Sequence, residues 1–232
     1  TKTYEKLVFN SCRLLKEISV HTPLKPVVVK SGTIQLLTKY LLHISRRIAV
    51  ISLITIRNLS DVAAIQPNQE ELIDILIRFV VNQLCAANQR NENKKIEEQL
   101  VASSLGILAN ITCNNQCNKE LLVSRGFVVT LINVCNVLKG KEIVEAAAST
   151  LRHITCRHSK CEEACKQFVK SKGLLMAINI LNINTPLSIA NSSNLKKVFF
   201  GLITNFASKP QYLAQIRDLK VTQLAAHTLA AV

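Results

Sequence analysis

The chain has 232 residues, of which 48% are hydrophobic, and it carries 29 basic against 15 acidic residues, a formal net charge of +14. With only 6 Gly and 5 Pro, the composition excludes a sheet of many hairpins and favours helices joined by short loops. No apolar run reaches the ~20 residues that span a membrane, so we expect no direct membrane insertion, and we expect no secretory signal. The positive charge attracts anionic partners and leaves acidic peptides, nucleic acids and acidic membrane surfaces open.

From the first residues onward, amphipathic helical patterns follow one another, and one short motif recurs in them. The motif has an apolar residue, two further residues, a second apolar residue and then Ser, Thr or Ala. In chain order it occurs at residues 15–19, 56–60, 108–112, 151–155 and 203–207. A helical pattern that repeats about every 40–50 residues is typical of armadillo and HEAT arrays. Both ends of the chain run through such patterns, so we expect a piece of a longer array.

A second marker, a Gly that closes an amphipathic run, falls between these motifs at Gly32, Gly126 and Gly173. Glycine supplies the left-handed residue that ends a helix, and a basic residue one or two positions before it suits the carbonyl end. Each unit is therefore predicted to hold a short helix, a second helix and a longer third helix that carries the motif. The second unit lacks its Gly and has a polar insertion at 88–95, and a further insertion is predicted at 182–193.

These markers predict an all-α fold, an armadillo-repeat right-handed superhelical solenoid with three helices per repeat. Gly between the first two helices of a unit favours armadillo over HEAT repeats. The third helices then stack side by side, because one unit cannot bury its apolar face alone. The predicted units of this single array over residues 1–232 are 1–22 (partial), 23–63, 64–115, 116–158, 159–209 and 210–232 (partial).

Three of the five motifs carry Asn at their centre, at Asn58, Asn110 and Asn205. A carboxamide offers two donors and an acceptor, so it can pair with both the N–H and the C=O of an extended peptide. Alternatively, each Asn joins its own helix to the turn that follows. Three Asn at solenoid spacing favour a ladder that binds a peptide along a concave groove.

Basic residues gather around these asparagines. A row of cations in a groove selects acidic ligands and steers their approach, whereas the alternative is a solvated basic face. We expect at least half of these cations to face a ligand. The candidates are Arg13, Lys16, Arg57, Lys119, Arg152, His153, Arg157, Lys196 and Lys197.

The eight cysteines are interpreted as reduced thiols of an intracellular protein, packed as small hydrophobes at positions such as Cys85, Cys113 and Cys135. Three more lie near two histidines, but structural zinc usually takes two close ligand pairs, and here only one local cluster exists. That cluster is Cys156, Cys161 and Cys165 with His153 and His158. We therefore expect packed thiols and no metal.

Motifs for catalysis are missing from the sequence. It contains no Gly-rich phosphate loop, no HExxH motif and no nucleophile elbow. No spacing in a helical array groups Ser, His and Asp into a triad. We expect neither an enzyme nor a cofactor.

Three segments resemble the β-catenin family. Residues 56–61 (IRNLSD) resemble the family's LRNLSD, residues 106–115 (GILANITCNN) resemble GILSNLTCNN, and residues 151–158 (LRHITCRH) resemble LRHLTSRH. Residues 4–7 are similar to the helix that leads into this region. The resemblance covers essentially the whole chain in order and corresponds to the later half of the family's armadillo domain.

In that family the groove binds acidic tails of cadherins and of T-cell-factor-type transcription factors, as well as destruction-complex scaffolds. The resemblance implies a monomeric scaffold or transcription coactivator in cell adhesion and/or Wnt signalling, found in the cytoplasm, at cell junctions and in the nucleus. It implies that Lys119 pairs with an Asp or Glu of the partner. The other positions that match the family's groove are Lys16, Arg57, Asn58, Asn110, Cys113, Asn114, Arg152, His153, Arg157, Lys197 and Asn205.

The chain departs from the family pattern at three groove positions. Ile54 stands where the family has Trp, Thr204 stands where it has Arg, and Glu17 brings a negative charge into the first groove position. These changes indicate a divergent member with a narrower set of partners. Two other functions remain as alternatives. An importin-α-like receptor would have an acidic, Trp-rich groove, and a nucleic-acid-binding helical repeat would need more aromatic residues for stacking.

Overall fold

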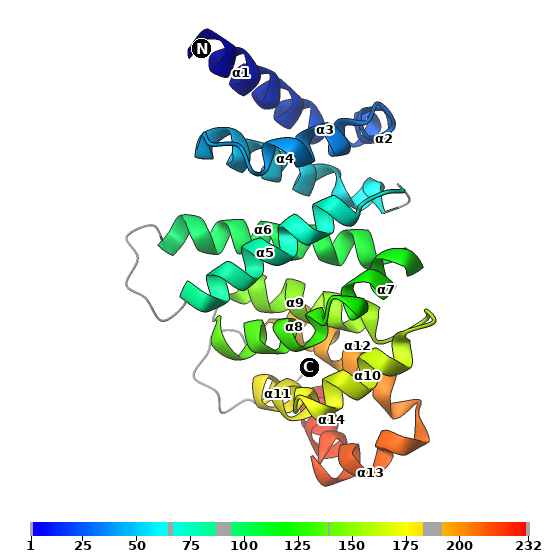
Figure 1. The fold of residues 1–232 in the computed structure, drawn as a ribbon. Helices are drawn as coiled ribbons and strands as arrows, with labels where there is room; N and C mark the ends of the chain where they lie inside the picture. The colour runs from blue at the N-terminus through cyan, green and yellow to red at the C-terminus, as the bar shows by residue number, and fades with distance from the viewer. Residues whose placement is uncertain (1, 65–66, 87–93, 139, 183–191, 231–232) are drawn as a thin grey trace. The chain divides into compact units, whose positions relative to one another are not determined.

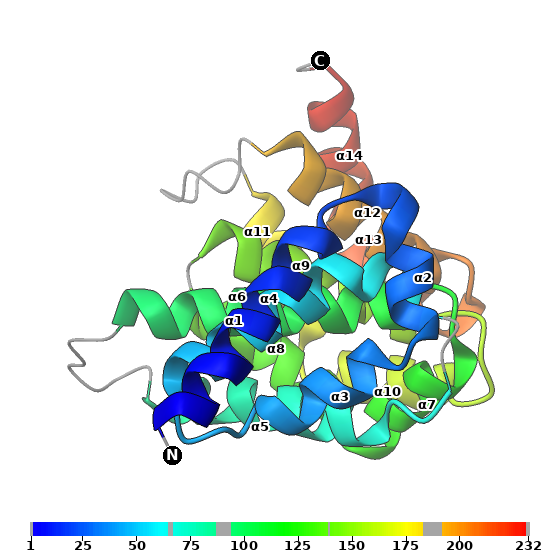
Figure 2. The same cartoon turned by 90° about the horizontal axis from the view of Figure 1, so that it is seen from above.

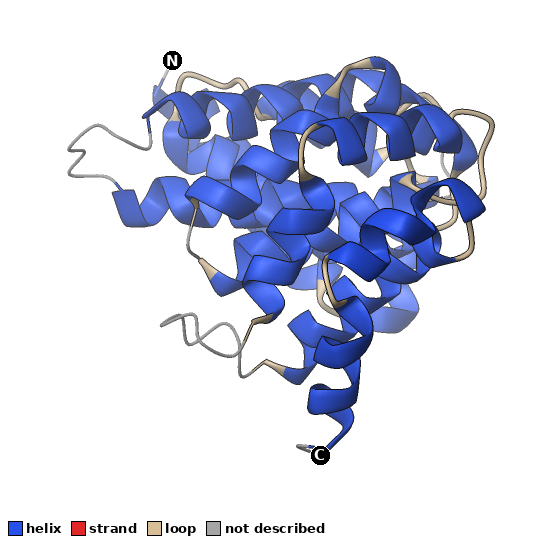
Figure 3. Ribbon diagram, turned by 90° about the horizontal axis from the view of Figure 1, so that it is seen from below, coloured by secondary structure: helices blue, strands red, loops and turns tan. Residues whose placement is uncertain are grey.

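The structure, a computed structural model, describes the chain except for residues 1, 65–66, 87–93, 139, 183–191 and 231–232. The described residues form helices and no strand (Figure 3), so the all-α prediction is confirmed for them. The chain divides into two compact units, residues 1–118 and residues 119–232, which we call the first part and the second part.

In the first part, α4 lies between α1 and α6 and packs against both (Figures 1 and 2). Apolar residues recur along α4 at helical spacing, and Leu53, Ile56 and Leu59 are fully buried as a result. The described elements are α1 (Lys2–Ser19), η1 (Thr22–Leu24), α2 (Lys25–Lys30), α3 (Thr33–Tyr40), α4 (Arg46–Ala63), α5 (Glu70–Ala86) and α6 (Lys94–Thr112).

In the second part, α9 packs against both α8 and α12. No Gly or Pro interrupts α9, and Glu142 in its first turn and Arg152 in its last suit the helix dipole. The elements are α7 (Gln116–Ser124), which starts just before this part, α8 (Phe127–Val137), α9 (Lys141–Ile154), α10 (Cys161–Lys170), α11 (Gly173–Leu181), α12 (Ser193–Ala207), α13 (Pro210–Asp218) and α14 (Val221–Ala230). Among the described residues no single helix is long and apolar enough to cross a membrane; α7 and α8 meet that test of length and composition only as a pair bent by 80°.

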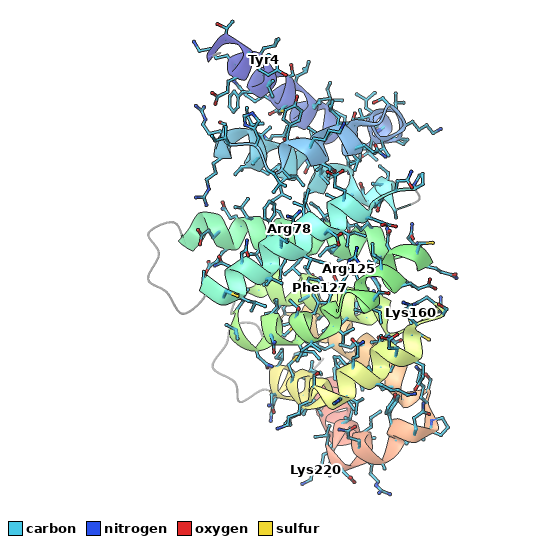
Figure 4. All side chains as sticks on the ribbon, viewed as in Figure 1. Tyr4, Arg78, Arg125, Phe127, Lys160 and Lys220 are labelled. Atoms are coloured by element: carbon cyan, nitrogen blue, oxygen red, sulfur yellow. The ribbon has the colours of Figure 1, made fainter. Side chains whose placement is uncertain are left out.

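Two of the three predicted glycine turns are confirmed. Gly32 and Gly126 take the left-handed conformation, with φ of 80° and 67°, and each separates two helices. Arg125, before Gly126, is exposed, and Phe127, after it, is 1% exposed and enters the core (Figure 4). The turn therefore switches the chain from a surface residue to a core residue within two positions.

At the third turn the prediction that glycine takes the left-handed conformation is wrong. Lys172 takes it, with φ of 59°, and Gly173 is the first residue of α11. A Cβ at Gly173 would lie 2.6 Å from the ring of Phe168. Glycine is needed here because the ring approaches the backbone closely, and the turn itself is made by a lysine.

Three helices per repeat are found in residues 23–63, 116–158 and 159–209, but residues 64–115 contain only two described helices, α5 and α6. The sequence of α5 has no Gly or Pro, so nothing ends the helix where the other repeats turn. It continues for 17 residues as one helix. The missing glycine that the sequence showed therefore fuses two helices into one.

The two predicted insertions fall largely outside the described residues. Of residues 88–95, only Lys94 and Lys95 are described, and they begin α6. Of residues 182–193, Asn182 follows the last residue of α11, and Ser192 caps α12 by accepting a hydrogen bond from the Leu195 N–H at 3.4 Å. The unit boundaries drawn from these insertions stay a prediction.

Candidate functional site

Five helices carry one copy of the recurring motif each: α1, α4 and α6 in the first part, and α9 and α12 in the second. We call them the ladder helices. Within each part, neighbouring ladder helices are in contact, α1 with α4, α4 with α6, and α9 with α12. The predicted stacking of motif-bearing helices is thus confirmed inside each part.

In the first part, the Asn of one ladder helix is hydrogen-bonded to the motif serine of the ladder helix before it. Asn58 Nδ2 donates to Ser19 Oγ at 2.9 Å, and Asn110 Nδ2 donates to Ser60 Oγ at 2.8 Å. Both hydroxyls in turn donate to a carbonyl of their own helix, at 2.6 Å and 2.8 Å. Each carboxamide is therefore held in one orientation by the neighbouring helix.

The second part repeats the link with threonine. Asn205 Nδ2 donates to Thr155 Oγ1 at 2.8 Å and to the Arg152 carbonyl at 2.9 Å. The alternative that each Asn joins its own helix to the following turn is therefore wrong, because all three amide groups donate to the preceding ladder helix. Within the described part of the chain, the Oδ1 atoms of Asn58, Asn110 and Asn205 accept no hydrogen bond, which leaves them for the N–H groups of a ligand.

Two arginines of the ladder helices lie against glycines of the next ladder helix. Arg57 covers Gly106 so closely that a Cβ there would lie 2.6 Å from Nη2. Arg152 covers Gly201, where a Cβ would lie 3.0 Å from Cδ and 3.3 Å from Nη1. Both glycines stand four residues before a ladder Asn. This shared spacing was a signal in the sequence, but the two glycines were not among the predicted site residues.

The two predicted cations on α1 both have partners on the same helix. The guanidinium of Arg13, which is exposed, lies 6.0 Å from the centre of the Phe9 ring. Lys16 Nζ forms an ion pair with Glu17 Oε1 at 3.2 Å. The negative charge that Glu17 brings to this position is thus offset by its own neighbour.

The other predicted basic residues of the second part differ in how far they reach into solvent. Arg157 and Lys197 are exposed, whereas His153 and Lys196 are half-buried. Arg157 follows the end of α9 in the left-handed conformation, with φ of 57°. Lys197 lies two turns before Asn205 on α12. An exposed cation therefore follows one ladder helix of this part, at Arg157, and another lies on the second, at Lys197.

Lys119 is only 5% exposed, although the resemblance implies that it pairs with a partner carboxylate. Its Nζ donates a long hydrogen bond of 3.4 Å to the Cys156 carbonyl. His158 is also buried, and its Nε2 lies 2.7 Å from the Ile154 carbonyl. Burial lowers the pKa of His158, and the nearby Lys119 charge lowers it further. One long bond leaves Lys119 with donors for a carboxylate, and that pairing stays a prediction.

The cysteine predictions are only partly right. Cys135 is buried, and burial raises the pKa of its thiol to about 12. Cys85 and Cys113 were predicted to pack as small hydrophobes, but both are exposed because they lie at or just after the ends of α5 and α6. Asn114, which follows Cys113, is exposed as well. Cys113 and Asn114 are thus open to solvent, as a peptide contact requires.

The thiols near the histidines bond to backbone carbonyls. Cys156 Sγ donates to the Arg152 carbonyl and Cys165 Sγ to the Thr155 carbonyl, both at 3.4 Å. In the portion of the chain that the structure describes, no three His, Cys, Asp or Glu side chains are grouped as a metal ion requires. These thiols pack within the helical array.

A charged cluster joins the start of α13 to the start of α10, and it was not predicted. Glu162 accepts hydrogen bonds from Lys209 Nζ at 3.0 Å, and from Tyr212 OH and Gln211 Nε2 at 3.1 Å. Lys209 Nζ also lies 3.1 Å from Cys165 Sγ. The bond from Lys209 lowers the pKa of Glu162, while burial and then Glu162 raise the pKa of Tyr212 to about 12. The residues are too far apart in sequence for local patterns to reveal them.

The first part has a neutral cluster at the corresponding place, between α7 and the residue before α5. Asn118 Nδ2 donates to Gln69 Oε1 at 2.8 Å and to the Ile111 carbonyl at 2.9 Å. Gln69 Nε2 donates to the Ala63 carbonyl. Gln69 and Asn118 are 4% and 6% exposed, so each amide supplies the hydrogen bond that water would make at an exposed position.

No family model matches the chain. Junction plakoglobin of Homo sapiens is 34% identical to it over 220 residues, an alignment that covers 94% of this chain and 27% of that protein. The chain thus spans about a quarter of the length of this curated relative.

Solved structures with the same fold include one from work on a phosphorylation switch that controls the interaction between cadherin and β-catenin. It superposes with a TM-score of 0.70 at 27% identity and covers 87% of this chain and 34% of that one. A designed armadillo repeat protein superposes with a TM-score of 0.68 over 93% of this chain and 83% of that one. At 15% identity the second likeness concerns the fold alone. The predicted armadillo-repeat solenoid is confirmed by these two superpositions.

Proposed function

Because the chain belongs to the β-catenin family of armadillo-repeat proteins, we propose that it is a non-enzymatic adaptor that binds an extended acidic peptide along its ladder helices. The proposed partners are the cytoplasmic tail of a cadherin, a T-cell-factor-type transcription factor and a destruction-complex scaffold. Binding would serve cell adhesion and Wnt-type signalling at cell junctions, in the cytoplasm and in the nucleus, with the chain acting as a monomer.

The observation that carries this proposal is the fixed orientation of the ladder asparagines. Asn58 Nδ2 and Asn110 Nδ2 each donate one hydrogen bond to the preceding ladder helix, and Asn205 Nδ2 donates two. Their Oδ1 atoms remain as acceptors for a ligand. A side chain that is already immobilised loses less freedom when it binds. Such carboxamides can pair with the backbone of an extended peptide whatever its side chains are.

The cations near the ladder asparagines of each part supply the preference for acidic side chains. Arg57, Arg157 and Lys197 are exposed, and a guanidinium can hold a carboxylate through two parallel hydrogen bonds. Lys119 would contribute from the edge of the core, where a carboxylate would add to its one long bond. The proposed ligand therefore carries Asp or Glu at intervals along an extended segment.

The two alternative functions are less well supported. A groove for basic import signals should carry carboxylates, whereas most of the predicted groove positions are cationic. Binding of single-stranded nucleic acid usually needs exposed aromatic rings for base stacking. Phe127, Phe168, Phe199 and Phe206 are fully buried and are not available for it.

Isothermal titration calorimetry with a synthetic cadherin-tail peptide rich in Asp and Glu tests the proposal. Wild type is compared with the double variant Arg57→Glu and Lys197→Glu, one charge reversal in each part. The control is Lys39→Glu with Lys170→Glu, exposed lysines of α3 and α10 outside the ladder helices. We expect the ladder variant to bind at least about tenfold more weakly, and the control to stay within about twofold.

The control separates recognition from general attraction, because both variants have the same net charge. Equal weakening in both would show that the chain attracts anions without a defined groove. No binding by the wild type would reject the proposed function. Binding of a Lys-rich and Arg-rich peptide in place of the acidic one would favour the import-receptor alternative.

A further inference from the structure

Glycine occupies the interior of two ladder helices, at Gly106 in α6 and at Gly201 in α12. Glycine weakens a helix interior relative to alanine, since the unfolded chain has more freedom to lose. Neither residue has the positive φ that would require glycine. Both stand one helical turn before a ladder Asn, so their position relative to the ligand-binding row is the same.

The reason for glycine is the arginine that lies over each of them. A side chain at position 106 would occupy the place of the Arg57 guanidinium, where a Cβ would be 2.6 Å from Nη2. At position 201 a Cβ would press against the stem of Arg152, at 3.0 Å from Cδ, and against Nη1 at 3.3 Å. The two contacts occur in different parts of the chain, so they are independent examples of the same arrangement.

The step from α1 to α4 shows what happens without glycine. There the residue four before the ladder Asn is Ile54, and the cation at the position of Arg57 and Arg152 is Lys16. Lys16 pairs with Glu17 of its own helix at 3.2 Å. An arginine therefore lies against the next ladder helix at the two places where that helix has a glycine.

We infer that Gly106 and Gly201 are positioning residues that let Arg57 and Arg152 lie flat on the next ladder helix, each forming a carboxylate subsite one turn from a ladder Asn. This inference rests on the proposed function and specifies which side chains of the ligand the two arginines recognise. A planar guanidinium held in place binds a carboxylate by donating two parallel hydrogen bonds, which a lysine cannot reproduce. The ligand should therefore place an Asp or Glu beside each backbone contact to Asn110 and Asn205.

Gly106→Ala tests the inference because it moves stability and affinity in opposite directions. The Arg57 guanidinium is the far end of a flexible, exposed side chain, so it can swing away and let the new methyl group fit. Alanine favours the helix, and we expect Tm to rise by about 2–4 °C. The peptide should bind about three- to tenfold more weakly, since Arg57 must be ordered again on binding.

A double-mutant cycle assigns the affinity loss to the arginine. Arg57→Lys should weaken binding about as much as Gly106→Ala, and adding Gly106→Ala to Arg57→Lys should cost no further affinity. The pair Arg152→Lys and Gly201→Ala should behave in the same way, with a smaller effect because the contact is looser. Unchanged affinity in Gly106→Ala, additive losses in the cycle, or a joint fall of Tm and affinity would each overturn the inference.

A measurement without ligand separates this inference from the proposed function. Nitrogen-15 relaxation of the arginine Nε–Hε groups reports how rigidly each guanidinium is held in the free protein. We expect the Arg57 signal to become more mobile in Gly106→Ala, while the signal of exposed Arg78 on α5 does not change. If the wild type fails to bind the peptide, the proposed function is wrong. If the mobility of Arg57 is unchanged in Gly106→Ala, the positioning role of Gly106 is wrong, whether or not the peptide binds.

Discussion

The two parts of the chain join the first helices of neighbouring repeats by different chemistry at the same place. In the first part, Asn118 reaches back to Gln69 through neutral amides. In the second part, Lys209 and Tyr212 reach back to Glu162 through charged groups. The same repeat geometry therefore tolerates either chemistry, but only the second link can respond to pH.

Burial explains which chemistry is used where. Gln69 and Asn118 are 4% and 6% exposed, and an ion pair moved to that depth would lose its hydration. The side chains of Glu162 and Lys209 are 42% and 21% exposed, so water still solvates part of each charge. We expect the amide link to contribute more to the free energy of unfolding than the ionic link, although the ionic link has charged hydrogen-bonding groups.

The largest expected effect concerns the aromatic packing under the ionic link. Phe206 stacks on Phe168 with ring centres 4.8 Å apart and meets Tyr212 edge to face at 5.5 Å. We expect Phe206→Ala to lower the free energy of unfolding by about 3–5 kcal/mol, because a fully buried ring is lost. Urea unfolding followed by circular dichroism measures this loss. Phe206→Leu, which restores the residue type of Leu59 in the first part, should lose clearly less, and a loss under about 1 kcal/mol for Phe206→Ala would contradict the packing.

A smaller effect is expected for the amide link. Asn118→Ala leaves the Gln69 side chain and the Ile111 carbonyl without their buried partner, which costs about 1–3 kcal/mol. The loss should be the same at pH 5 and pH 8, because neither amide titrates. Asn114→Ala is the matched control at an exposed position and should change stability by less than about 0.5 kcal/mol. A loss that varied with pH would remove the distinction between the two links.

The smallest effect is expected for Glu162→Gln. Lys209 lowers the pKa of Glu162 in the folded chain, so its contribution is full above the unfolded pKa of about 4.3 and is lost as pH falls through the folded value. The carboxylate is more than a third exposed, and after screening we expect a loss of about 0.5–1 kcal/mol at pH 7. Urea unfolding between pH 3 and pH 7 should show the variant and the wild type converging in acid. Glu163→Gln, at the next, exposed position, should follow the wild type, and a constant offset across this range would argue against the ionic link.

Local signals in the sequence predicted much of the fold and part of the site. The ladder asparagines and the turns at Gly32 and Gly126 depend on a few adjacent residues, and the missing glycine of α5 already indicated an atypical repeat. The burial of Lys119 and the pairing of Lys209 with Glu162 could not be read in this way. Both depend on segments that lie roughly one repeat apart in the sequence and pack together in the fold. A pattern within a single helix does not show how neighbouring repeats are aligned.

The hydrogen bonds of the ladder also give the motif at residues 56–60 two different ends. In Asn58-Leu59-Ser60, the Asn donates a hydrogen bond to the repeat before it, and the Ser accepts one from the Asn of the repeat after it. Repeats joined by this hydrogen bond can follow one another only in one direction, because the Asn must face the preceding repeat. A repeat that carries both the Asn and the hydroxyl can be joined to any other repeat of that kind. Duplication of a repeat that carries both ends would then leave the hydrogen bonds on either side of it matched, so the array could lengthen there without a new kind of joint.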